Sequence, residues 1–234
     1  IALFRGCTSY ENVILPDGLT AIPDYMFANT GIQNLVIPES VTNMSGTGLF
    51  MDCAKLESVT VDDGITAIEE RAFYNCTALK SIVLPEGITS FGDSDWETED
   101  ATFKNCTSLE SVTLNEAIYS FGTHAFENCT SLKEIDMSEC WDLWEINQYA
   151  FRNCTALETV IFSESSYDIY EDAFAGCSAL TSFPLPDSVT TISRGAFQGC
   201  SGLTSFMIPD KVTALDVYVL AGCRGLESLI IPDG

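Results

Sequence analysis

The sequence predicts a mostly β solenoid, in which short units stack along one axis through a parallel sheet and a second row of short strands. Two observations predict this fold: a segment of about sixteen residues returns along the whole chain, and its apolar positions keep one phase. Versions of the segment read AFYNCTALKSIVLPEG from Ala72, TFKNCTSLESVTLNEA from Thr102 and AFENCTSLKEIDMSE from Ala125. Self-similarity with a fixed period of roughly 20–50 residues is typical of a solenoid.

A phenylalanine marks each unit, and most steps between markers are 23 residues long. The markers are Phe4, Phe27, Phe50, Phe73, Phe103, Phe126, Phe151, Phe174 and Phe197, with Leu220 in the tenth place. Two steps are longer, 30 residues after Phe73 and 25 residues after Phe126. We therefore expect about ten 23-residue repeats, with insertions at 93–100 and 140–142.

Within each unit, two apolar residues flank a single outward residue, which is the alternation of a β-strand. In the unit of Phe73 the apolar residues are Ile82 and Leu84, and Val83 should face solvent. A turn such as PEG follows, and then a four-residue segment with apolar ends, such as ITSF, predicts the second short strand. One unit buries too few side chains to fold alone, so its neighbours in the stack must cover it.

The composition excludes several classes of protein. Asp and Glu total 34 against 10 Lys and Arg, a net charge of −24, which disfavours nucleic acid and anionic membranes as partners. Apolar residues reach 46%, so the charge does not indicate disorder. No run approaches the roughly 18 apolar residues of a membrane span. The chain starts and stops inside a unit, and we expect residues 1–234 to form a single solenoid domain of a larger protein.

These residues resemble the BspA-like, Treponema-type leucine-rich repeat. The shared pattern is Leu, two residues, Val, one residue and Leu-Pro, then Val-Thr, one residue and Ile, and finally Ala-Phe and Cys. The resemblance covers essentially the whole chain, and it implies a leucine-rich-repeat solenoid on a secreted or surface-attached bacterial or protist protein. It also implies adhesion to, or binding of, host or neighbouring-cell proteins, and it supplies no catalytic residues. The chain departs from the pattern at Thr30, where Cys is expected.

Nine cysteines share one phase and should form a row inside the stack. They are Cys7, Cys53, Cys76, Cys106, Cys129, Cys154, Cys177, Cys200 and Cys223. Their side chains would point in parallel, which favours buried free thiols over a disulfide framework or a metal site. Cys140 is off phase and is expected at the surface. Asn in the Asn-Cys-Thr context, as at Asn75, is expected to bond its own backbone in a turn, with glycosylation as the alternative.

The second strand carries a local anomaly in its outward position. This position holds Thr in most repeats, namely Thr20, Thr42, Thr66, Thr89, Thr190 and Thr213, but it becomes Tyr119, Trp144 and Tyr167 in three adjacent repeats. Trp96 and Trp141 lie in the two insertions, and the single histidine, His124, lies between them. We interpret these six residues as a candidate partner-binding patch that anchors a protein or stacks on sugar rings. The alternative is that the aromatic residues stabilise the sheet and that Trp96 covers them.

An acidic residue recurs in the turn of every repeat, including Asp63, Glu86, Glu116 and Glu139. Stacking would align these carboxylates along one edge, where calcium is one candidate ligand. The alternative is turn preference together with solubility. A second metal alternative is His124 together with Asp95 or Glu97, and the sequence indicates no cofactor.

No enzyme is indicated, because His124 has no nucleophile at a recognisable spacing and the chain has no Gly-rich phosphate loop. The sequence and the resemblance together predict a protein-binding or adhesion module of a secreted or cell-surface protein. Its partner would be a protein, on a host or neighbouring cell, or a glycan. Two alternatives stay open: a carbohydrate-binding module that uses the aromatic patch, and a structural spacer that projects other domains. Nucleic acid and membrane insertion are not expected.

Overall fold

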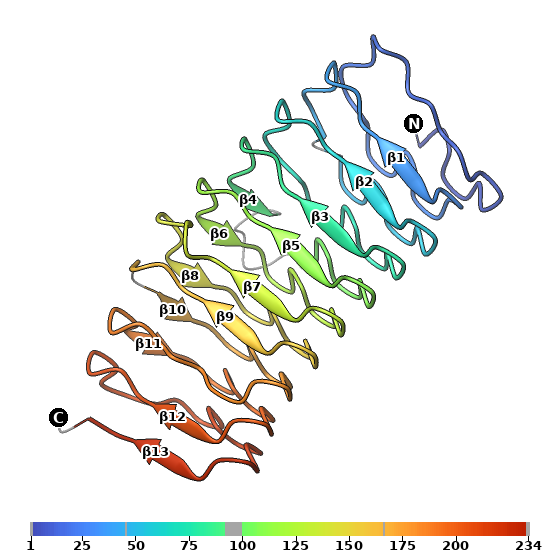
Figure 1. Ribbon diagram of the computed structural model, residues 1–234. Helices are drawn as coiled ribbons and strands as arrows, with labels where there is room; N and C mark the ends of the chain where they lie inside the picture. Colours follow the sequence, from blue (N-terminus) through green and yellow to red (C-terminus); the bar gives the residue numbers. More distant parts are fainter. Residues whose placement is uncertain (1, 45, 92–99, 166, 233–234) are drawn as a thin grey trace.

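The chain winds into an all-β solenoid in this computed structural model, which describes residues 2–44, 46–91, 100–165 and 167–232. Figure 1 shows the turns stacked from the N-terminus to the C-terminus, with two rows of strands running along the stack. The repeats average about 24 residues, because two of them carry the insertions. The described residues contain no helix, and hence none of the length and apolarity that crossing a membrane requires.

The first row consists of three-residue strands that pair in parallel. They are β1 (Asn34–Val36), β2 (Ser58–Thr60), β3 (Ser81–Val83), β5 (Ser111–Thr113), β7 (Glu134–Asp136), β9 (Thr159–Ile161), β12 (Ser205–Met207) and β13 (Ser228–Ile230). The hydrogen-bonded pairs are β1–β2, β3–β5, β7–β9 and β12–β13. Seven of these strands bury their middle residue and expose the other two, as the alternation predicts.

The repeat of Phe174 forms no first-row strand, and the reason is its sequence. Pro184 stands where the other repeats have the third strand residue, and proline has no N–H to donate to a ladder. The apolar residue beside it, Phe183, is still buried in the core. The column of inward side chains is therefore continuous even where the strand is not.

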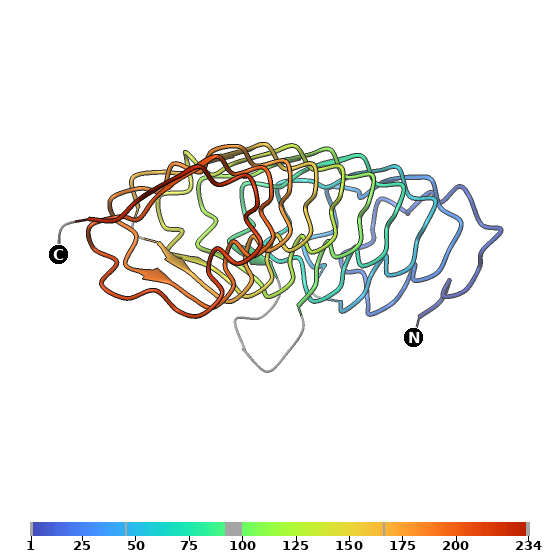
Figure 2. The ribbon, with the colours of Figure 1, turned by 90° about the horizontal axis from the view of Figure 1, so that it is seen from below.

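The second row is one sheet of two-residue strands. It runs in the order β11 (Thr191–Ile192), β10 (Asp168–Ile169), β8 (Glu145–Ile146), β6 (Ser120–Phe121) and β4 (Ser90–Phe91), with parallel pairing. Seen from below in Figure 2, the turns superpose as flattened coils around one interior. The predicted fold class, a leucine-rich-repeat solenoid with a parallel sheet and a second row of short strands, is confirmed.

The marker phenylalanines form a continuous stack through this interior. Phe103 lies on Phe73 with ring centroids 5.1 Å apart, although 30 residues separate them in sequence. Across the second long step, Phe126 and Phe151 stack at 5.3 Å. Both insertions therefore leave the ladder undisturbed. The first insertion, 93–100, lies outside the described residues except for Asp100.

The cysteine row is confirmed as a ladder of free thiols from Cys53 to Cys223, whereas Cys7, in the first turn, is exposed rather than buried. Cys76 donates its S–H to the carbonyl of Phe50 in the preceding turn at 3.1 Å, and Cys129 and Cys200 do the same to Phe103 and Phe174. Each thiol from Cys53 to Cys223 thus bonds a backbone carbonyl of the preceding turn. Burial raises the pKa of the Cys200 thiol to about 12, so it stays protonated at neutral pH.

Cys140 corrects one expectation, because it is buried rather than exposed. Its thiol donates to the carbonyl of Asn115 at 3.5 Å. Burial, followed by the nearby Asp136 and Glu139, raises the pKa of this thiol to about 11. The second insertion turns the Cys140 side chain inward while the neighbouring Trp141 points outward, which repeat phase does not predict.

The asparagines beside the cysteines also form a ladder, which corrects the expectation that each bonds its own backbone. Asn105 donates its side-chain amide to Asn75 at 2.7 Å, and Asn128 donates to Asn105 at 2.7 Å. Asn153 continues the chain to Asn128 at 3.0 Å. These asparagines have positive φ, a conformation that Asn tolerates better than most residues.

The thiol ladder predicts a sharp pattern of chemical labelling. In the native protein, iodoacetamide should modify the exposed Cys7 first, because thiolate formation and access control the reaction. Cys76, Cys129 and Cys177 should react only after unfolding in urea, because burial raises their pKa and blocks access. Peptide mass spectrometry reads the sites directly. Rapid labelling of these three thiols without urea would contradict the ladder.

Candidate functional site

Two aromatic side chains stand exposed on the second sheet. Tyr119 is 40% exposed and Trp144 is 51% exposed. Each precedes a strand residue of the register pair Ser120 and Glu145, so the two lie on adjacent turns in the same column. We call Tyr119 and Trp144 the aromatic pair. Their outward orientation agrees with the sequence prediction.

Trp141 is the third exposed aromatic residue of this region, at 55% exposure. It lies in the turn between β7 and β8, three residues before Trp144. Its backbone carbonyl accepts a hydrogen bond from the Ser165 hydroxyl of the next turn at 2.5 Å, which fixes the loop. Trp96, the remaining predicted tryptophan, lies outside the described residues.

Tyr167 does not belong to this patch, and the prediction that it faces solvent is wrong. Its side chain is only 1% exposed, and its hydroxyl is hydrogen-bonded to the Ser163 hydroxyl at 2.7 Å. The ring packs edge-on against Phe162 at 5.1 Å. Phe162 and Ser163 of the same repeat thus hold the Tyr167 ring inside the stack, which the repeat phase does not predict.

His124 takes part in a local polar network away from the aromatic pair. Its Nδ1 lies 2.5 Å from Glu127 Oε2, and the ring stacks on Tyr149 with centroids 4.6 Å apart. Lys104 Nζ reaches the same Glu127 oxygen at 2.8 Å. Among the described residues, no ring contact joins His124 to Tyr119 or Trp144. The network bridges three turns of the stack, which indicates a stabilising role.

This network predicts how stability depends on pH. Burial raises the pKa of Glu127, but the hydrogen bonds from His124 and Lys104 outweigh it and lower the pKa from 4.5 to about 2. A lowered pKa means that the ionised carboxylate stabilises the fold above pH 4.5, and that this contribution disappears as the pH falls toward 2. Urea unfolding between pH 6 and pH 2 should show the loss, and Glu127→Gln should flatten that part of the profile. A profile that Glu127→Gln leaves unchanged would refute this role of Glu127.

A buried polar cluster lies next to the aromatic pair, and sequence reasoning missed it. Glu145 Oε1 accepts hydrogen bonds from the Ser120 hydroxyl at 3.1 Å and from the Asn147 amide at 2.9 Å. Asn147 also donates to the carbonyl of Phe121 at 2.9 Å. These bonds tie β6 to β8 and hold the backbone that carries both rings. The available signal was Glu145 itself, since other repeats place Ala, Ser, Thr, Asn or Asp at its position.

The turn carboxylates proposed as calcium candidates, Asp63, Glu86, Glu116 and Glu139, are all exposed. Within the described ranges, no group of three or more His, Cys, Asp or Glu side chains lies close enough to hold a metal ion. Calcium needs six to eight oxygen ligands, which a single file of carboxylates does not bring together. The arrangement therefore fits turn preference and solubility better than a metal site.

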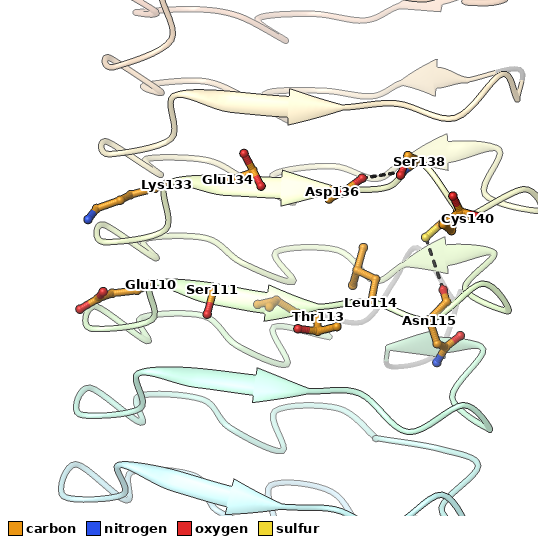
Figure 3. Close-up of a pocket in the computed structure, with 12 residues that line it drawn as sticks. Glu110, Ser111, Thr113, Leu114, Asn115, Lys133, Glu134, Asp136, Ser138 and Cys140 are labelled. Carbon is orange, nitrogen blue, oxygen red and sulfur yellow. Dashed lines mark hydrogen bonds between the residues drawn. The ribbon is translucent and has the colours of Figure 1, made fainter.

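A groove of about 350 Å³ lies between β5 and β7 on the outer side of the first row. Figure 3 shows the polar side chains that line it, with Ser111 and Thr113 from β5 beside Glu134 and Asp136 from β7. The two strands are neighbours in the stack, but they belong to separate hydrogen-bonded pairs. No motif in the sequence predicts this groove.

Comparison with known protein families shows the family of this chain. The BspA type leucine rich repeat region matches residues 2–99 and 96–227, in six copies. The chain belongs to the BspA-type leucine-rich repeat family. The stacked phenylalanines, cysteines and asparagines described above lie within the matched residues of this BspA-type chain. No curated protein sequence matches it.

Solved structures of bacterial proteins share the fold of the BspA-type chain. A leucine-rich repeat protein from Bacteroides ovatus is 23% identical with a TM-score of 0.57, over 97% of this chain and 68% of that one. A leucine rich cell surface protein from Faecalibacterium prausnitzii is 25% identical with a TM-score of 0.57, over 99% and 75%. The pneumococcal vaccine antigen PcpA is 25% identical with a TM-score of 0.61, over 90% of this chain and 53% of PcpA.

Proposed function

We propose that the chain is a protein-binding, adhesive module of a secreted or cell-surface protein and that it has no catalytic activity. Membership of the BspA-type family supports this, as does similarity to a protein described as a leucine rich cell surface protein. The observation that carries the proposal is the aromatic pair, which stands exposed at the position where most repeats have threonine.

The physical case rests on exposure combined with rigidity. Tyr and Trp are enriched among the residues that contribute most to protein interfaces, because they bury large areas at little cost in side-chain entropy. Here both rings directly precede the paired strands β6 and β8, whose backbone is held by Ser120, Glu145 and Asn147. A rigid platform loses little conformational freedom on binding, which favours affinity. Trp141 extends the apolar surface along the adjoining turn.

The test replaces the three exposed rings in one variant, Tyr119→Thr, Trp144→Thr and Trp141→Ser. Beads coated with the wild-type chain should adhere to a panel of mammalian epithelial and bacterial cells, and the triple variant should lose most of this adhesion. Tyr218→Asn is the matched control, since Tyr218 is an exposed aromatic residue in the segment between β12 and β13. Protease treatment of the cells should abolish adhesion. Undiminished adhesion of the triple variant would remove the aromatic residues from the function.

Carbohydrate binding is the second candidate. It is favoured by two rings that directly precede adjacent parallel strands, which lie about 4.8 Å apart, a spacing that suits stacking against a sugar chain. Two results together would indicate a glycan partner instead of a protein. The wild-type chain would bind a glycan array and the triple variant would not, and adhesion of the wild type to cells would survive protease treatment of those cells. If neither cells nor glycans bind, the spacer role is favoured.

A further inference from the structure

The outer face of the first row changes character at β7. Seven of the eight strands place no charged side chain at either outward position, whereas β7 places Glu134 and Asp136 there. The outward residues of the other strands are Asn34 and Val36, Ser58 and Thr60, Ser81 and Val83, Ser111 and Thr113, Thr159 and Ile161, Ser205 and Met207, and Ser228 and Ile230. One strand in the middle of the stack is therefore doubly acidic at two positions that are uncharged in the other seven strands.

These two carboxylates keep their charge available for a partner. In the described part of the chain, Glu134 forms no ion pair, and neither does the adjacent Lys133. Asp136 accepts a hydrogen bond from the backbone N–H of Ser138 at 2.9 Å, which holds its side chain at the end of β7. Nearer the N-terminus, by contrast, Lys80 neutralises Glu57 at 2.7 Å.

The surroundings of β7 give this acidic position a defined shape. The 350 Å³ groove lies beside it, within the size range of small-ligand pockets. On the same face, Val83 of β3 is 65% exposed and Ile161 of β9 is 37% exposed. Exposed aliphatic side chains thus lie on both sides of the acidic strand along the stack, with Ile161 on the adjacent β9 and Val83 on β3, beyond β5. Apolar and polar contacts occur together in protein interfaces.

We propose that Glu134 and Asp136 bind an arginine side chain of a partner protein, while Val83 and Ile161 contact apolar residues on either side of it. Residues two apart on a strand lie about 6.6 Å from each other on one face, a separation that the forked guanidinium can bridge better than a compact ammonium. The charge of the face selects a basic segment, and the flanking aliphatic side chains supply the apolar contact. This surface is separate from the aromatic pair and does not depend on it.

The probe is a fluorescein-labelled octa-arginine peptide, measured by fluorescence anisotropy at an ionic strength of about 0.15 M. The test variant, Glu134→Ser with Asp136→Thr, gives β7 the outward residues of β5 and should fold normally. The matched control, Glu86→Ser with Glu116→Ser, removes the same charge from exposed turns. We expect the test variant to bind about tenfold more weakly and the control to stay within about twofold of wild type. An octa-lysine peptide should bind wild type more weakly than octa-arginine.

Equal weakening of both variants would show that net charge alone attracts the peptide, and would overturn the proposal. So would the absence of wild-type binding. The aliphatic contacts are tested by Val83→Ser with Ile161→Ser. This variant should bind a peptide of alternating Arg and Leu more weakly than wild type does, and its binding of octa-arginine should be unchanged. The ring variant Tyr119→Thr with Trp144→Thr should keep full octa-arginine binding. Failure of the bead-adhesion test would therefore not affect the octa-arginine result, and failure of the octa-arginine test would not affect the bead-adhesion result.

Discussion

Replacing Phe126 with alanine should lower the free energy of unfolding by about 3–5 kcal/mol. The ring stacks between Phe103 and Phe151, at 5.3 Å from each, and its surroundings include the edges of Phe91 and Phe121. Removing it leaves a cavity in the middle of the ladder that the neighbouring turns cannot close without breaking their own stacking. Urea unfolding followed by circular dichroism measures the loss.

Phe4→Ala serves as the control for position in the stack. Phe4 is only partly buried and has a ladder neighbour on one side, Phe27. Its loss should cost below about 2 kcal/mol, within the range of ordinary substitutions. Because coupling between repeats is local, Phe126→Ala should also separate the unfolding of the two halves into distinct steps. Similar losses for both variants would show that the ladder does not dominate stability.

Tyr167→Thr should cost about 3 kcal/mol or more, whereas Tyr119→Thr and Trp144→Thr should each change stability by less than about 1 kcal/mol. The three residues occupy one column of the repeat, but Tyr167 alone is buried, against Phe162 and Ser163. Its loss creates a cavity and removes the hydroxyl that accepts the Ser163 N–H at 3.2 Å. Thermal and urea unfolding of the three single variants decide the matter.

Tyr167→Phe divides this effect into its parts. It keeps the ring and removes only the hydroxyl, so it should cost about 1–2 kcal/mol through the unsatisfied Ser163 groups. If Tyr167→Thr were as mild as Tyr119→Thr, the ring would not be a core residue, and Tyr167 would rejoin the aromatic patch. In that case, the variant used in the adhesion test would also have to replace Tyr167.

Repeat phase alone predicts much of this fold. Val83 and Thr113 face outward because a strand alternates, and Cys76 and Cys106 stack because equivalent positions superpose when each repeat covers the next. The exposure of Tyr119 and Trp144 follows from the same phase. Strand alternation and stacking of equivalent positions are shared by all repeats, so each repeat in the sequence supports the prediction for the others.

Departures from the average repeat were predicted less well. Asn105 bonds Asn75 rather than its own backbone, since the stack brings their amides to 2.7 Å. Cys140 turns inward because the second insertion changes the path of the chain around it. The segment Glu134-Ile135-Asp136 is visible in the sequence, but only the structure shows that, among the described residues, Glu134 forms no ion pair with a neighbouring cation.

The sequence by itself determined the period, the two rows of strands and which columns face the core, because a 23-residue repeat can bury its apolar side chains only against copies of itself. Tertiary structure alone decided where the irregular side chains go. Tyr167 lies inside and Trp144 outside in the same column because the free volume beneath each depends on the side chains of the adjacent turns. That volume is a property of the packed stack, and no single repeat specifies it.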